Sequence, residues 1–163
     1  GLIFGQNGIT AAVNTHFTTS GTGLYKHTTK VQSHPGVTFR SVSGANGYTI
    51  SGRLDMSGAS ASASMPIALP VGARIIAVRV FIQDSGVGPT KLTASLRSLT
   101  SAGTATTIAS SSESSGGATN QTLTVSPAAT SIASSTGYSV GIVTTTGSDA
   151  TIVWGCEVDY DQP

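Results

Sequence analysis

Residues 65–100 read MPIALPVGARIIAVRVFIQDSGVGPTKLTASLRSLT. Within them, Ile76, Val78, Val80 and Ile82 alternate with residues 77, 79, 81 and 83. Successive side chains of a β-strand point to opposite faces, so this period of two predicts a strand over 74–83. The Ser-Gly-Val-Gly-Pro break at 85–89 and the renewed alternation over 91–97 predict a hairpin with one polar face.

The rest of the chain favours the same class of structure. No segment keeps a 3.6-residue period over three turns, so we expect no helix of ordinary length. Further strands are expected near 9–13, 16–19, 25–30, 37–42, 48–56, 65–68, 91–99, 104–110, 121–125, 138–145 and 152–160. This pattern predicts an all-β protein, an antiparallel β-sandwich of the jelly-roll type with about eight to ten strands.

The composition excludes several functional classes. Only 9% of the 163 residues are charged and the formal net charge is +1, so we expect neither nucleic-acid binding nor attachment to an acidic membrane. No apolar run reaches the roughly 20 residues of a membrane span, so no membrane insertion is expected. The single Cys156 forms no disulfide within the chain, and we expect it to be a buried apolar residue.

The chain divides into two parts that differ in composition and in how strictly apolar and polar residues alternate. Residues 1–47 hold all three histidines (His16, His27 and His34) and alternate less strictly, so we predict an amino-terminal arm there and a sandwich over 48–163. The Ser/Ala tract at 57–64 and the Ser-rich tract at 110–119 are interpreted as surface loops, with strands of small residues as the alternative. A start at Gly1 without methionine suggests a processed product or a piece of a longer protein.

No catalytic constellation emerges from the sequence, so we expect a protein that is not an enzyme and needs no cofactor. Residues 137–141 match G-x-S-x-G, but this nucleophile motif needs a strand-to-helix turn and a later histidine. Here Ser139 lies in a predicted strand and every histidine precedes it. We interpret the match as coincidence.

Two groups of residues are candidates for binding. Glu157, Asp159 and Asp161 share one face of the last strand, which suits either a solvated charged face or an ion such as Ca²⁺. Aromatic rings bind the apolar faces of sugars while polar groups bind their hydroxyls. Tyr25, with His27 beside it, and Tyr48 are therefore the candidates for carbohydrate binding. Tyr138, Trp154 and Tyr160 are the other aromatic residues considered, and Trp154 and Tyr160 are assigned to the core with Cys156 and Val158.

The sequence of residues 66–75, followed by Asp84-Ser-Gly and by Leu92-x-Ala-Ser-Leu96, resembles the carboxy-terminal β-sandwich domains of phage tail fibres and tailspikes. The resemblance implies a homotrimer in the virion tail that maintains the fibre, binds bacterial surface polysaccharide, or does both. The His-x-His repeats of some fibre tips are missing. The alternatives are a monomeric carbohydrate-binding module of a secreted polysaccharide-degrading enzyme, and a small glycosidase or lyase.

Overall fold

The computed structural model describes residues 15–20, 23–48, 52–84, 91–115, 119–128, 130–146 and 151–162. Within these ranges the chain forms eleven strands, one short 3₁₀ helix and no α-helix. The elements are β1 Thr15–Ser20, β2 Gly23–Pro35, η1 Gly36–Thr38, β3 Arg40–Tyr48, β4 Leu54–Ile67, β5 Arg74–Asp84, β6 Lys91–Leu99, β7 Ala105–Ser110, β8 Asn120–Val125, β9 Thr130–Ser131, β10 Gly137–Thr146 and β11 Thr151–Gln162. The predicted all-β class is confirmed, and none of the described helices could cross a membrane.

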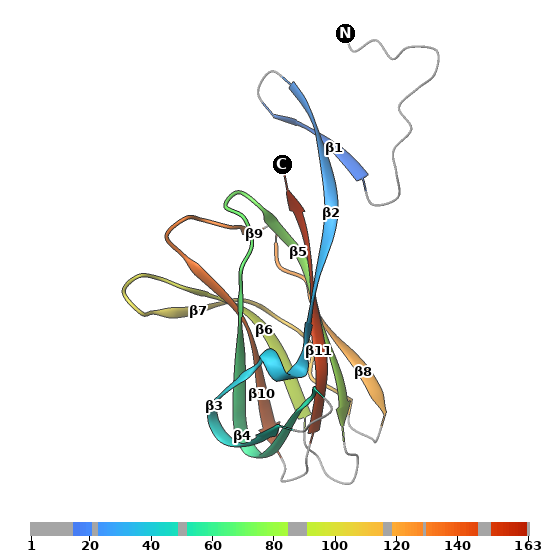
Figure 1. Ribbon diagram of the computed structural model, residues 1–163, viewed down its shortest axis with the longest axis vertical. Helices are drawn as coiled ribbons and strands as arrows, with labels where there is room; N and C mark the ends of the chain where they lie inside the picture. Colours follow the sequence, from blue (N-terminus) through green and yellow to red (C-terminus); the bar gives the residue numbers. More distant parts are fainter. Residues whose placement is uncertain are drawn as a thin grey trace.

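The strands form two antiparallel layers (Figure 1). The first sheet has the order β1-β2-β11-β5, with β8 and β9 on the far edge of β5. The second has the order β3-β4-β10-β6-β7. The layers join where the first residues of β11, 151–153, pair with β4. The result is the predicted β-sandwich.

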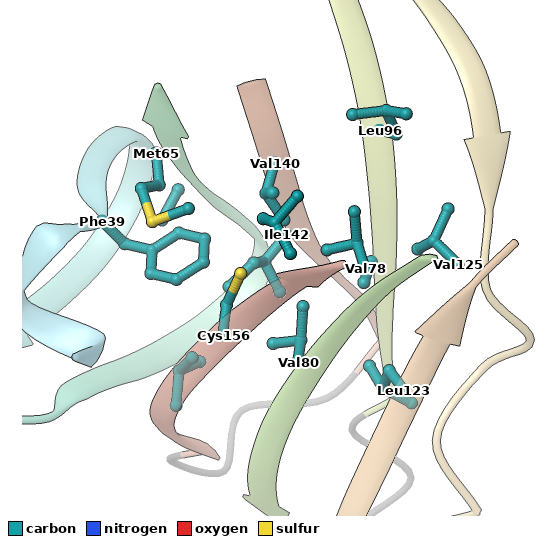
Figure 2. Packing of buried hydrophobic residues seen from close by; sticks show 14 of the residues in the cluster. Phe39, Met65, Val78, Val80, Leu96, Leu123, Val125, Val140, Ile142 and Cys156 are labelled. Atoms are coloured by element: carbon teal, nitrogen blue, oxygen red, sulfur yellow. The ribbon is translucent and has the colours of Figure 1, made fainter. Parts of the chain in front are cut away.

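The core lies between the two sheets, as Figure 2 shows for residues of both layers. Alternate residues of β5, Val78, Val80 and Ile82, are fully buried, and Val140 and Ile142 of β10 approach them from the second sheet. Each such side chain contributes about 1.5–3 kcal/mol when it leaves water. The strict alternation read from the sequence is therefore what supplies one apolar face to each sheet.

The Ser/Ala tract at 57–64 is not a surface loop, so the preferred interpretation of that tract was wrong and the strand alternative is correct. It forms the middle of β4, between β3 and β10, with Ala61 and Ala63 buried. The Ser-rich tract differs, because its described part is irregular. There Ser111 and Ser114 still donate their backbone N–H groups to Ala94 and Leu92 of β6, each at 2.9 Å.

Two β-bulges change which residues face the core. The register between β11 and β5 slips at Trp154 and slips back at Ile76, one unpaired residue on each strand. Trp154 is consequently 41% exposed and Ile76 37% exposed, whereas Val153 and Ile75 are buried. The expectation that Trp154 belongs to the core row was therefore wrong, because a bulge inverts the facing of every residue before it.

The predicted boundary between residues 47 and 48 falls inside β3. Residues 28–35 of β2 pair with β11, β3 pairs with β4, and Phe39 is fully buried. These segments are thus parts of the sandwich. Within the described ranges, the hairpin of β1 and the first residues of β2 is the part that extends beyond it (Figure 1). The strand expected near 9–13 lies outside the described residues.

Candidate functional site

The outer face of the first sheet carries an exposed tryptophan. Trp154 sits at the bulge of β11, and the Arg53 guanidinium carbon lies 5.4 Å from the centre of its ring. The next residue, Gly155, pairs with Phe81 of β5 on one side and with Pro35 of β2 on the other. A Cβ atom at Gly155 would come within 2.5 Å of the backbone oxygen of His34, so only glycine lets β2 approach this closely.

Two shallow depressions share Trp154 and Phe81 as lining residues. The first, about 340 Å³ in volume, extends toward β2 and includes Ser33 and His34. The second, about 350 Å³, extends toward β8 and includes residues 120–122. Together they span the outer face from β2 to β8, with the two aromatic residues between them. Pockets of this size with an aromatic wall suit small ring-shaped ligands.

Hydrogen-bonding side chains on the outer face are Ser33 in the first depression and Asn120 and Thr122 in the second, which pair with Glu157, Gln83 and Phe81. Gln121 and His34 point to the other side of the sheet, because they pair with the buried Ile82 and Cys156. There Gln121 accepts hydrogen bonds at its Oε1 from the backbone N–H (2.9 Å) and hydroxyl (3.1 Å) of Ser115, and burial lowers the pKa of His34. The hydroxyl and amide groups of the outer face suit hydroxyl-bearing ligands.

The three predicted carboxylates of β11 lie on one outer face, as expected, but arginines of β5 bind them. Arg79 donates to both oxygens of Asp159 (2.6 and 2.7 Å) and to Glu157 Oε2 (3.2 and 3.3 Å). These bonds, that to Asp159 first, raise the pKa of Arg79. Arg74 donates to the fully buried Asp161 at 2.6 Å.

These ion pairs bear on the calcium hypothesis. Within the described ranges, no three His, Cys, Asp or Glu side chains lie close enough together to hold a metal ion. The described residues form an ion-pair ladder between β5 and β11, and binding of Ca²⁺ by these carboxylates stays a prediction. Arg79 occupies an outward position of the predicted strand, which is a signal for the ladder, but no sequence pattern shows which strand lies alongside.

The carbohydrate candidates Tyr25, His27 and Tyr48 do not come together. In the β1–β2 hairpin, Tyr25 pairs with Thr18 and His27 with His16, while Tyr48 pairs with Leu54 at the other end of the sandwich. Leu54 pairs with Val153 and Thr28 with Gln162, so the two groups are about 30 Å apart along β11. Their side chains lie outside the described part of the structure, and their role in binding stays a prediction.

The remaining sequence candidates have structural positions. Ser139 is the third residue of β10, between Pro66 of β4 and Arg97 of β6, where the strand continues and no nucleophile turn forms. Cys156 is buried, as predicted, and burial raises the pKa of its thiol to about 12. Trp154 and Phe81 are the residues that sequence reasoning missed. The exposure of Trp154 depends on a bulge that alternation alone does not reveal, whereas the outward position of Phe81 follows from the alternation in β5.

The sequence matches no protein-family model and no curated protein. Among solved structures, the chain is similar to the CBM36-1 domain of a multidomain xylanase from the hindgut metagenome of Trinervitermes trinervoides. The identity is 10%, the alignment covers 79% of this chain and 96% of that one, and the TM-score is 0.53. The C-terminal CBM6 of LamC, a marine laminarinase from Zobellia galactanivorans, aligns with 12% identity, 79% and 98% coverage and a TM-score of 0.51. Identities this low show the fold alone.

Two longer proteins also align. The chain covers 34% of a family two carbohydrate esterase from Cellvibrio japonicus, at 11% identity, over 83% of its own length and with a TM-score of 0.46. It covers 19% of the enzymatically active domain of bacteriophage CBA120 tailspike protein 4, at 11% identity, over 79% of its own length and with a TM-score of 0.47. These scores carry no argument about function. The resemblance to phage sandwich domains stays a prediction.

Proposed function

We propose that this domain binds carbohydrate through the outer face of the first sheet, with Trp154 as the platform for a sugar ring. The observation that carries the proposal is the exposure of Trp154 between two depressions that also offer the polar side chains of Ser33, Asn120 and Thr122. The indole face covers the C–H groups of a pyranose, and the polar groups bind its hydroxyls. The sandwich supplies a rigid support, because β11 is paired on both edges at this level.

The proposal is tested with variants of exposed residues. Trp154→Ala should abolish retardation of the protein in native gels that contain the polysaccharide it binds, drawn from a panel of xylan, laminarin and bacterial capsular and lipopolysaccharide glycans. Val71→Ala is the matched control, since Val71 is an exposed apolar residue in a turn away from this face. Urea unfolding checks that both variants keep the fold. Undiminished binding by Trp154→Ala would refute the role of this face.

The place of the domain in a larger assembly is a narrower hypothesis. The pattern over residues 65–100 supports a tail fibre or tailspike domain that forms a homotrimer and binds host polysaccharide in the virion tail. The alternative is a monomeric binding module of a secreted enzyme. Light scattering separates the two, since the first predicts the mass of three chains and the second the mass of one.

We also propose that the domain binds its glycan without cleaving it. The arginine ladder supports this, because Arg79 pairs with both Glu157 and Asp159, so neither of these neighbouring carboxylates is free to act on a glycosidic bond. Incubation with the bound polysaccharide should release no oligosaccharide. Released oligosaccharide would instead assign the domain to the glycosidases or lyases.

A further inference from the structure

A groove runs from the edge between the two sheets, at η1 and the end of β2, across the outside of the second sheet. It consists of two depressions that share Arg40 and Pro66 as lining residues. The larger, about 610 Å³, reaches toward η1 and includes His34 and Thr38. The smaller, about 340 Å³, crosses β4 and β10 and includes Ser64 and Ser139. The shared residues make the groove longer than either depression, as an extended ligand requires.

The groove is positively charged. Arg40 is exposed, and among the described residues no Asp or Glu lines either depression. Arg97 lies beside the smaller depression without lining it: it pairs with Ser139, and its guanidinium lies over Gly141, the partner of Ser64, where a Cβ atom would come within 2.6 Å of the guanidinium carbon. Its Nε donates to Ser95 at 3.0 Å. Among the described residues, neither Arg40 nor Arg97 forms an ion pair, in contrast to Arg74 and Arg79 on the first sheet.

The floor of the groove favours a sugar chain over a peptide. Peptides commonly bind sheets by adding a strand to a free edge. Here Ser64 of β4 lies between paired residues of β3 and β10, and Ser139 of β10 lies between paired residues of β4 and β6, so neither residue lies on a free strand edge. What the floor offers instead is the side chains of Ser64 and Ser139, while Val42 (66% exposed) and Leu99 (47% exposed) form apolar walls. Hydroxyls and C–H surfaces are what a glycan matches.

We infer that this groove binds a carboxylate-bearing polysaccharide, a polymer that contains uronic acid, with Arg40 and Arg97 as the carboxylate-binding residues. A guanidinium group binds a carboxylate through two parallel hydrogen bonds, which an ammonium group cannot reproduce. The site goes beyond the proposed function, because it lies on the other sheet and selects a charged ligand. Either site can therefore fail without the other.

Calorimetric titration of the whole chain with polygalacturonate and with alginate, at low salt, tests the inference. The Arg40→Gln/Arg97→Gln double variant should lose affinity by about tenfold or more. The control is Lys30→Gln/Lys91→Gln, which also removes two positive charges, here from exposed side chains that contact Gln162 and Glu113. It should bind as the parent chain does, and so should Trp154→Ala. An Arg40→Lys/Arg97→Lys variant should lose part of the affinity.

Several results would overturn the inference. They are no binding to either polymer by the parent chain, an equal loss in the lysine control, or a loss of polygalacturonate binding in Trp154→Ala, which would move the site to the first sheet. An affinity for poly-glutamate equal to that for polygalacturonate would show that the groove binds negative charge without recognising a sugar. Tight binding of neutral dextran by the same arginines would exclude carboxylate recognition. Thermal melting of each variant separates loss of binding from loss of fold.

Discussion

Replacing either of two neighbouring residues of β4 by aspartate tests whether the Ser/Ala tract is a core strand. Ala63 is 1% exposed and faces the core, whereas the next residue, Ser64, faces outward beside Arg40. In a flexible loop the two substitutions would have similar effects. In the strand described here, Ala63→Asp places a carboxyl group between the sheets and Ser64→Asp places it in solvent.

The magnitude follows from the pKa of aspartate, about 3.9 in an unfolded chain. A core aspartate avoids charge by staying protonated, which costs about 1.4 kcal/mol for each pH unit above that value, or about 4 kcal/mol near about pH 7. Burying the neutral carboxyl without a partner adds about 1–3 kcal/mol. Ala63→Asp should thus lower the free energy of unfolding by about 5–7 kcal/mol, a large part of the usual 5–15 kcal/mol. Ser64→Asp should change it by about 0.5 kcal/mol or less.

The pH dependence of the difference gives a second, independent readout. The folded-state pKa of the core aspartate is raised, so its penalty grows as the pH rises above the unfolded value and shrinks as the pH falls toward it. Near about pH 4, the gap between the two variants should narrow by about 4 kcal/mol. Urea unfolding followed by the fluorescence of the single tryptophan measures both free energies. Equal unfolding midpoints of the two variants near pH 7 would refute the inward orientation of Ala63. A difference between their free energies of unfolding that does not change with pH would refute it as well.

Three further predictions concern residues of the first sheet. In urea unfolding, Arg74→Gln should lower the free energy of unfolding by about 1–3 kcal/mol more than Asp161→Asn does. The first variant leaves a fully buried carboxylate without its guanidinium, whereas the second leaves a partly exposed guanidinium that water can solvate. Equal losses in the two variants would contradict this. Gly155→Ala should cost about 1–3 kcal/mol through its clash with β2, against almost nothing for Gly137→Ala, where the nearest atoms are 3.7 Å from a Cβ. Cys156, with its pKa raised to about 12, should react with iodoacetamide at about pH 8 only after unfolding in urea, as measured by mass spectrometry; fast native labelling would show that the thiol is accessible.

The sequence was sufficient for features that depend on one strand alone. The alternation over 74–83 located β5, the break at 85–89 separated it from β6, and Cys156 was correctly placed in the core. Such patterns are local, because the facing of side chains along an extended chain repeats every two residues whatever the neighbouring strand is.

Only the tertiary structure decided which residues form the candidate sites. The bulge that exposes Trp154 exists because β11 pairs with β5 in one register before it and in another after it, so no window of one strand contains that information. The pairing of Arg79 with Glu157 and Asp159 joins residues about 80 positions apart in the chain. Small residues such as Ala63 carry too weak an apolar signal to reveal a strand until two neighbours and an opposite sheet enclose them. The register of paired strands and the stacking of the two sheets depend on contacts between segments that are distant in the sequence. They decide which side chains share a surface, and so which ligands that surface can bind.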